Sequence, residues 1–88
     1  MYKIVFSDDA RKGLLLLQKK YPFAVKKLKV LLKEICNDPR FGTGQAERLK
    51  HYKVETWSRR ITREHRLVYR INQDVVEVLV LSVYGHYI

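Results

Sequence analysis

Several polar side chains of the types that transfer protons and hold phosphate occur in the second half of the chain. They are Glu47, Lys50, His51, Arg60, His65, Arg66, His86 and Tyr87. A carboxylate, several arginines and a histidine beside a basic sheet would suit phosphoryl transfer in RNA. In such a reaction a base takes the proton of a ribose 2′-OH, fixed positive charge stabilises the pentavalent phosphate, and an acid protonates the departing 5′-oxygen. No single spacing demands this set, so the residues alone are a weak signal.

Other kinds of site have less support. A metal site would have to draw on the single cysteine and the three histidines, and no two of these have the spacing of metal ligands. The segment 42–44, Gly-Thr-Gly, is too short for a phosphate-binding loop and is interpreted as a turn. We therefore expect neither a metal nor another cofactor.

The elements that would position these side chains follow from hydrophobic periodicity. Apolar residues spaced three and four apart predict helices over 10–20, after a Ser7 cap, and over 22–37. Alternation predicts strands over 2–6, 48–52, 56–61, 65–72 and 75–83, with a turn at 72–74. The last strand is apolar on both faces, which indicates a central or covered position. The fold class is α+β: one N-terminal strand, a helical pair, and a four-stranded antiparallel meander forming one sheet packed on the helices.

A hairpin around residues 62–64 determines which side chains share a face. We place Ile61 opposite His65, so that Arg60 faces Arg66 on the neighbouring strand. Because side chains alternate across a sheet, the helix-packed face would carry Trp57, Ile61, His65, Leu67, Tyr69 and Ile71. The other face would carry Ser58, Arg60, Arg66, Val68 and Arg70. A register shift of one residue would exchange the two faces.

Three arginines would then stand together on the face that the helices leave open. Like charges directly opposite one another on neighbouring strands destabilise a sheet by a few tenths to about 1 kcal/mol. A protein that accepts Arg60 against Arg66 is expected to use them on an anion. The alternative is that they are only solvated, or paired with Glu47 and Glu64.

The histidine and aromatic side chains have structural as well as functional interpretations. His65 falls on the core face and is expected to be a buried structural histidine. Trp57 and Tyr69 are interpreted as core residues rather than as base-stacking residues. His51 is equally compatible with RNA contact and with a plain surface position. His86, near the end of the sequence, would ordinarily be a surface residue.

Composition narrows the class of protein. The 88 residues suffice for one domain with a modest core, so residues 1–88 are expected to form a single domain. Eighteen Lys and Arg against nine acids give a net charge of +9, which favours a polyanionic partner: nucleic acid, an acidic protein or an anionic membrane surface. One cysteine excludes an internal disulfide, and no apolar run is long enough for a membrane span or a signal peptide. We expect a soluble cytoplasmic protein that does not enter a membrane.

Three blocks of sequence carry a resemblance to a known family. They are Glu47-Arg48-Leu49-Lys50-His51, the run WSRRITREHRLVY from Trp57 to Tyr69, and the pair His86-Tyr87. In content, order and spacing they resemble the Txe/YoeB toxins of bacterial toxin–antitoxin pairs, within the RelE-like superfamily. The central block is long and specific. The similarity covers nearly the whole chain, with most of its weight after Gly42.

The resemblance implies an activity and a set of residue roles. Such toxins are ribosome-dependent endoribonucleases that cut mRNA in the decoding A site without a metal. The resemblance implies that Glu47 is the general base, that Arg66 stabilises the charge of the transition state, and that His86 is the general acid. Tyr87 would orient or stack the mRNA. The candidate RNA-binding residues are Lys50, His51, Arg60 and Arg70.

The expected partners follow from the resemblance and from the charge. They are mRNA in the ribosomal A site, ribosomal RNA, and an acidic antitoxin of YefM or Axe type that folds on the toxin surface. A homodimer is compatible with the family. The alternative is a non-catalytic binding module of RelE/ParE fold, which would grip nucleic acid or a protein target such as gyrase. Such a module would need the arginines but not Glu47 or His86.

Overall fold

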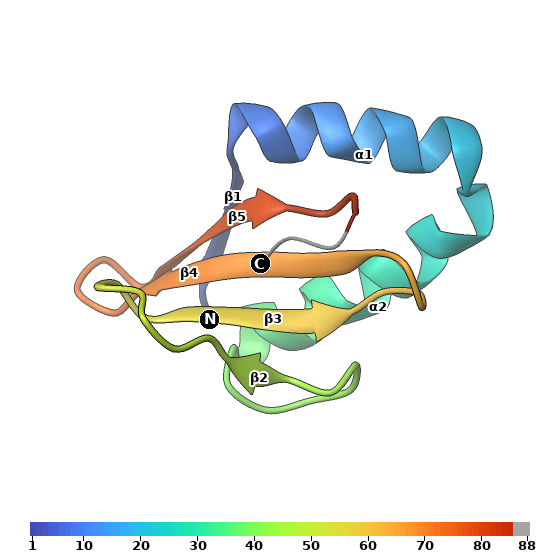
Figure 1. The fold of residues 1–88 in the computed structure, drawn as a ribbon. Helices are drawn as coiled ribbons and strands as arrows, with labels where there is room; N and C mark the ends of the chain where they lie inside the picture. Colours follow the sequence, from blue (N-terminus) through green and yellow to red (C-terminus); the bar gives the residue numbers. More distant parts are fainter. Residues whose placement is uncertain (86–88) are drawn as a thin grey trace.

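The computed structural model describes residues 1–85, and its elements follow the predicted order (Figure 1). They are β1 (Lys3–Phe6), α1 (Asp8–Lys20), α2 (Pro22–Asn37), β2 (Glu47–Arg48), β3 (Thr56–Arg60), β4 (Arg66–Asn72) and β5 (Glu77–Ser82). The predicted site residues His86 and Tyr87 lie outside the described residues. Within residues 1–85, no helix is both long and apolar enough to cross a membrane.

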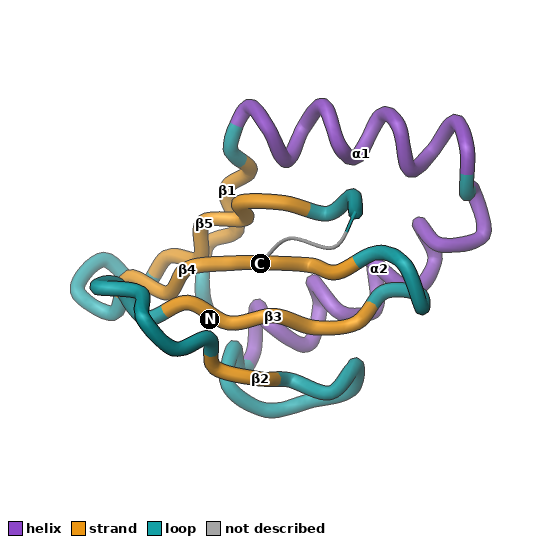
Figure 2. The backbone as a smooth tube through the Cα atoms, viewed as in Figure 1, coloured by secondary structure: helices purple, strands orange, loops and turns teal. Residues whose placement is uncertain are grey.

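The five strands form one mixed sheet in the order β1-β5-β4-β3-β2 (Figure 2). Strands β2 to β5 pair antiparallel in sequence, so the predicted meander is confirmed. β1 returns to the sheet beside β5 and runs parallel to it, with Lys3 opposite Glu77. β5 therefore has a strand on each side, which confirms the interior position that its two apolar faces indicated. The α+β class is likewise confirmed.

The helical pair covers one face of the sheet, with α2 behind it in Figure 1 and α1 along the β1–β5 side. α1 begins where expected, because the Ser7 hydroxyl accepts a hydrogen bond of 3.1 Å from the Ala10 N–H. α2 begins at Pro22, whose missing N–H costs nothing in a first turn. The helices and the sheet bury a common core of Ala10, Leu17, Ala24, Leu28, Leu31, Ile35, Ile61, Leu67, Tyr69, Ile71, Val78, Val80 and Val83.

The predicted register of the central hairpin is confirmed. Arg60 lies opposite Arg66, and Trp57 lies opposite Tyr69. The N–H groups of residues 61 and 62 both donate to the His65 carbonyl, at 3.0 and 3.1 Å, which closes the turn where it was expected. Tyr69 is fully buried and Trp57 half-buried, so both are core residues as predicted.

Two strands differ from the prediction by more than one residue at an end. The strand expected over 48–52 is only Glu47–Arg48, because the chain turns at His51, whose φ of 69° no strand residue adopts. The last strand begins at Glu77 rather than at residue 75. Asn72 pairs with Glu77, so Val75 and Val76 are used in the turn, where they are 61% and 41% exposed.

Candidate functional site

Glu47 and the three predicted arginines lie on the same face of the sheet. Glu47 on β2 is directly opposite Ser58 on β3, and two positions further along β3, Arg60 is opposite Arg66 on β4. Directly opposed residues point to the same side, and alternate residues of a strand share that side. Arg70, four positions after Arg66, therefore belongs to the same face. This is the face that does not carry the helix-packed core.

This face is less open than predicted. Ser58 is 1% exposed and Val68 is fully buried, although both point away from the helices. The arginines around them are half-buried. Long arginine side chains cover shorter neighbours with their methylene groups while the charged heads stay in water, so such a face can be basic and still bury small residues. Glu47, at the β2 edge, is exposed.

The alternative interpretation required Glu47 to pair with the arginines of this face, and within the described residues it forms no ion pair with Arg60 or Arg70. Within residues 1–85 the ion pairs are Arg40 with Glu55 and Arg59 with Glu34, so neither includes Glu47 or Arg70. The Nε atom of Arg70 is buried and has no hydrogen-bond partner in the described part of the chain. A buried donor without a partner loses the free energy of its hydration, and an anion placed beside it would restore a hydrogen bond.

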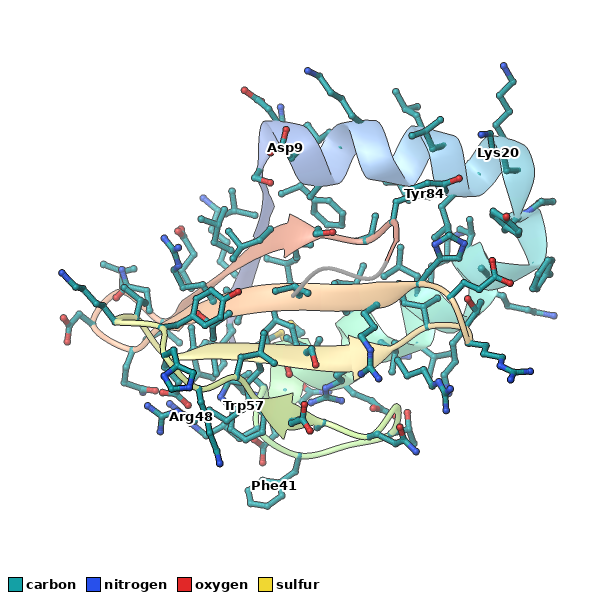
Figure 3. All side chains as sticks on the ribbon, viewed as in Figure 1. Asp9, Lys20, Phe41, Arg48, Trp57 and Tyr84 are labelled. Atoms are coloured by element: carbon teal, nitrogen blue, oxygen red, sulfur yellow. The ribbon has the colours of Figure 1, made fainter. Side chains whose placement is uncertain are left out.

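Lys50 and His51 lie at the other end of the sheet from the opposed arginine pair. They form an exposed turn directly after β2. Because β2 is antiparallel to β3, the chain after Glu47 runs toward the start of β3, where Arg70 lies across on β4. Glu47 therefore lies between the pair Arg60 and Arg66 at one end of the sheet and Arg70 with the Lys50–His51 turn at the other. The candidate residues do not gather at one point. Figure 3 shows Arg48, the other residue of β2, next to its partner Trp57.

The C-terminal segment is tied to the start of β4 through Gly85. The Arg66 N–H donates to the Gly85 carbonyl at 3.1 Å, and the Gly85 N–H donates to Nδ1 of His65 at 2.8 Å. His65 is 4% exposed, and its ring lies between the tilted rings of Tyr21 and Tyr84, with both centroid distances 4.6 Å. The expected structural role of this histidine is confirmed, and because Nδ1 accepts, the neutral ring carries its proton on Nε2.

Sequence reasoning missed Arg59, which is fully buried on the helix-packed side of β3. Its guanidinium donates to Glu34 on α2 and to the carbonyl of Phe41, in the loop that leads to β2. Figure 3 shows Phe41 projecting outward from that loop. The hairpin register places Arg59 opposite Leu67, on the core face. A charged arginine at a core position must have polar partners. The alternation of side chains along β3 therefore already indicated that Arg59 is a buried, paired residue.

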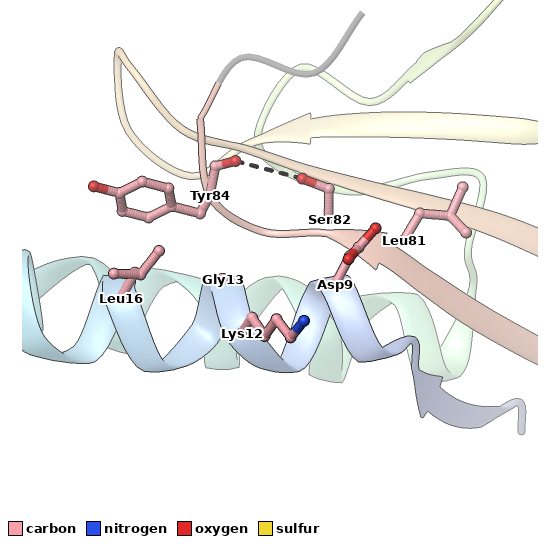
Figure 4. A pocket seen from close by; sticks show the side chains of 7 residues that line it. All are labelled: Asp9, Lys12, Gly13, Leu16, Leu81, Ser82 and Tyr84. Atoms are coloured by element: carbon pink, nitrogen blue, oxygen red, sulfur yellow. Dashed lines mark hydrogen bonds between the residues drawn. The ribbon is translucent and has the colours of Figure 1, made fainter.

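A pocket lies elsewhere, between α1 and the end of β5 (Figure 4). Its volume is about 290 Å³. It is lined by Asp9, Lys12, Gly13, Leu16, Leu81, Ser82 and Tyr84. None of the predicted site residues that the structure describes lines it. Within residues 1–85, no three His, Cys, Asp or Glu side chains gather closely enough to hold a metal ion.

The carboxylates of Glu34 and Glu55 are expected to make the stability of the fold sensitive to acid. Burial would raise the pKa of Glu34, but hydrogen bonds from Thr43 and the charge of Arg59 outweigh burial and lower it from the usual 4.5. A hydrogen bond from Arg40 lowers the pKa of Glu55 despite its partial burial. Because both pKa values are lower in the folded chain than in the unfolded one, this stabilisation is complete above about pH 4.5 and decreases as the pH falls through the folded-state values.

Urea unfolding followed by the fluorescence of the single tryptophan, between about pH 7 and pH 3, measures this dependence. The unfolding free energy should fall at the acidic end. A variant with both Glu34→Gln and Glu55→Gln should lose less stability over the same range. An equally steep loss in the variant would show that other carboxylates cause the acid sensitivity.

The opposed arginine pair should cost stability. Replacing Arg60 by Gln removes one of two like charges directly opposite one another, so the unfolding free energy is expected to rise by a few tenths to about 1 kcal/mol. The gain should shrink at high salt, since added ions screen the repulsion. Urea denaturation at low and high salt tests both points. A loss of stability that salt does not change would mean that Arg60 contributes more through packing than it costs through repulsion.

Comparisons of the sequence and of the structure with known proteins all point to the same family of toxins. Residues 6–87 match the model of a family described as the YoeB-like toxin of bacterial type II toxin–antitoxin systems. The chain is 38% identical to Toxin YoeB of Escherichia coli K12 over 85 residues, which is 97% of this chain and 99% of that protein. The structure of the YoeB dimer from Staphylococcus aureus has a TM-score of 0.84 at 34% identity, with 98% of each chain covered. The heterotetrameric YoeB–YefM toxin–antitoxin complex from the same organism has a TM-score of 0.81 at 34% identity, with 99% of each chain covered.

Proposed function

Because the chain belongs to the YoeB-like toxins of bacterial type II toxin–antitoxin systems, we propose that it is a ribosome-dependent endoribonuclease that cuts mRNA in the decoding A site. The observation that carries this proposal is that Glu47 shares a face of the sheet with the opposed pair Arg60 and Arg66. A carboxylate and fixed cations on one surface are the groups that attack of a 2′-OH on a phosphate requires when protein side chains do the chemistry.

Each proposed role accounts for one proton or one charge. Glu47 takes the proton of the ribose 2′-OH, and the freed oxygen forms a bond to the adjacent phosphorus. Arg66, with Arg60 opposite, stabilises the negative charge that accumulates on the pentavalent phosphate. His86 gives a proton to the 5′-oxygen as its bond to phosphorus breaks. The products are a 2′,3′-cyclic phosphate and a 5′-hydroxyl end, and Tyr87 orients or stacks the mRNA.

The backbone supports the inclusion of His86 in this set. His86 lies outside the described residues, but it is bonded to Gly85, whose carbonyl accepts a hydrogen bond from the Arg66 N–H. Gly85 has a φ of 81°, a conformation that glycine adopts without strain. The last described residue before His86 therefore lies beside the proposed charge-stabilising arginine.

Four basic residues are proposed to hold RNA, and one of them, Arg60, also helps Arg66 to stabilise the phosphate charge. Lys50, His51, Arg60 and Arg70 lie on or beside the face that carries Glu47, and they would contact the phosphates of mRNA and of ribosomal RNA. Contacts to phosphate dominate the affinity of basic proteins for nucleic acid without selecting a sequence. The net charge of +9 is consistent with this mode of binding.

The proposal is tested by mapping mRNA ends on programmed ribosomes. The purified protein is added to ribosomes that hold a defined codon in the A site, and primer extension locates any cut. The expected result is a cut within that codon, absent when the same mRNA is free of ribosomes. Equal cutting of free mRNA would refute ribosome dependence while leaving a nuclease. Bound protein without any cut would favour the non-catalytic binding module, and a gyrase supercoiling assay would then test a protein target.

An acidic antitoxin is the proposed regulatory partner. The similar toxin from S. aureus forms a complex with YefM, and the basic sheet face of this chain would attract an acidic segment. The affinity for a YefM-like antitoxin is therefore expected to fall as salt rises from low to about 0.5 M, mainly through a slower association rate. Surface plasmon resonance at several salt concentrations measures this. Equal affinity at low and high salt would refute attraction by opposite charge.

A homodimer is proposed for the free toxin. The S. aureus relative forms a YoeB dimer, and this chain covers 98% of it at 34% identity. Light scattering of the purified toxin over a range of concentrations tests this. A mass of 10.5 kDa at every concentration would refute it.

A further inference from the structure

The loop between α2 and β2 is held by hydrogen bonds from one buried side chain, the guanidinium of Arg59. The Arg59 guanidinium, on β3, donates from Nη1 to Oε1 of Glu34 at 2.9 Å and from Nη2 to the Phe41 carbonyl at 2.8 Å. Nη2 also reaches the Asp38 carbonyl at 3.3 Å, and Nε donates to the Tyr69 hydroxyl at 3.0 Å. One side chain thus joins a helix, two strands and two points of the loop.

The partners of Arg59 hold the same loop at further points. Glu34 accepts hydrogen bonds from the Thr43 N–H at 2.9 Å and from its hydroxyl at 3.0 Å. The Tyr69 hydroxyl donates to the Pro39 carbonyl at 2.7 Å. The next residue of β3, Arg60, donates its N–H to the Gly44 carbonyl at 2.6 Å. Backbone groups of the loop are therefore fixed from residue 38 to residue 44, three positions before Glu47.

Stability alone does not account for this arginine. Burial of a guanidinium costs desolvation free energy, and well-packed apolar residues in place of a buried ion pair often leave stability unchanged or raise it. An apolar side chain, however, would not bind the loop carbonyls. The loop backbone is also fitted to the ion pair, because a Cβ at Gly42 would collide with the side chains of Arg59 and Glu34.

The strand that carries Glu47 has little else to hold it. β2 consists of two exposed residues at the edge of the sheet, and within residues 1–85 its one paired strand is β3, with one further backbone hydrogen bond from the Leu49 N–H to the Thr56 carbonyl at 2.8 Å. Two-residue pairing is weak by itself, since isolated short strands are marginal in water. The loop that precedes β2 is, by contrast, anchored at several backbone groups. The place of the Glu47 carboxylate is therefore set largely by the loop.

We propose that Arg59 is a positioning residue for the cleavage reaction, which fixes the loop 38–44 and through it the carboxylate of Glu47. This inference rests on the proposed role of Glu47 as the general base. A displacement of a reacting group by about 1 Å lowers a rate by about 10²-fold. A side chain that keeps the charge but loses the fork of donors should give a loss of this order.

The test is an Arg59→Lys variant in the programmed-ribosome cleavage assay, under single-turnover conditions. Lysine retains the charge beside Glu34 but cannot reach both loop carbonyls and the Tyr69 hydroxyl. We expect the maximal cleavage rate to fall about 10²-fold while the concentration of ribosomes giving half-maximal rate stays unchanged. Arg63→Lys, on the exposed turn between β3 and β4, is the matched control and should cleave as the wild type does.

A double-mutant cycle separates positioning from a general loss of structure. If Arg59 acts through Glu47, then adding Arg59→Lys to Glu47→Gln should leave the residual rate unchanged. A further 10²-fold loss in the double variant would overturn the inference, and so would a wild-type rate for Arg59→Lys. If Glu47→Gln itself cleaves normally, Glu47 is not the general base and the proposed function is wrong. That result differs from one in which only Arg59→Lys cleaves normally.

A second variant covers the case in which Arg59→Lys does not fold, as judged by circular dichroism. Glu34→Gln keeps the shape of the carboxylate and an acceptor for Arg59, but removes the charge and weakens the bonds to Thr43. It is expected to lower the cleavage rate and to speed amide hydrogen exchange at residues 43–49, with exchange in β4 unchanged. Exchange at residues 43–49 as slow as in the wild type, together with a wild-type cleavage rate, would overturn the inference.

Discussion

A Glu47→Gln variant is expected to cleave mRNA about 10²–10⁴-fold more slowly than the wild type while still binding the ribosome. The amide has nearly the same shape as the carboxylate but cannot accept the 2′-OH proton. Glu47 is exposed and forms neither of the ion pairs described for residues 1–85, so its replacement should leave the fold intact. Single-turnover cleavage on programmed ribosomes measures the rate, and ribosome pelleting measures binding.

The matched control for this substitution is Asp74→Asn. It makes the same change of charge on an exposed turn after β4, at the opposite end of that strand from the pair Arg60 and Arg66. Its cleavage rate should equal that of the wild type. If Glu47→Gln also cleaved at the wild-type rate, or inhibited growth fully when expressed alone, the assignment of Glu47 as base would be wrong.

An Arg66→Ala variant is expected to lose about 10²–10³-fold in maximal cleavage rate. The guanidinium would be placed where the pentavalent phosphate gains negative charge, so its loss raises the barrier more than it weakens binding. The backbone bond from the Arg66 N–H to Gly85 does not depend on the side chain and should survive. Arg66→Lys should recover part of the loss, because it restores the charge without the two parallel donors.

The informative measurement is the division of the effect between rate and affinity. A transition-state role predicts a lower maximal rate at nearly constant affinity for the ribosome. Arg63→Ala removes the same charge from the exposed turn and should change neither quantity. If Arg66→Ala weakened ribosome binding and left the maximal rate unchanged, Arg66 would be an RNA-binding residue and not a stabiliser of the transition state.

The central hairpin could be predicted because two constraints agreed. Apolar alternation puts Leu67, Tyr69 and Ile71 on one side, and only one register then sets Trp57 against Tyr69. The shared face of Arg60 and Arg66 followed from this register alone. The position of Glu47 beside them did not, since β2 is held by a loop with no periodicity to read.

The predicted start of β5 was wrong for a physical reason. Valines favour strands, so Val75 and Val76 were assigned to β5. The core, however, requires Ile71 opposite Val78, and this places Asn72 opposite Glu77. The four residues between that pair must then form the turn, and Val76 takes a φ of 51° that β-branched residues rarely adopt. Tertiary pairing thus overrode local propensity.

The role of Arg59 could not be predicted for a related reason. The register put it on the core face, but its partners lie on α2 and in the irregular loop after it. Their distances from β3 depend on how the helix packs, which periodicity does not state. Contacts of this kind become visible only once the layers are assembled.

The parallel pairing of β1 with β5 has a consequence for the order of events during synthesis. Lys3 must wait for Glu77, which is added 74 residues later, before its strand gains a neighbour. Pairing between such distant segments is slow compared with local hairpin formation. The tie between Gly85 and Arg66 comes later still. A nascent chain therefore cannot pair β1 with the sheet, or tie the start of β4 to Gly85, until nearly all of residues 1–85 have been made.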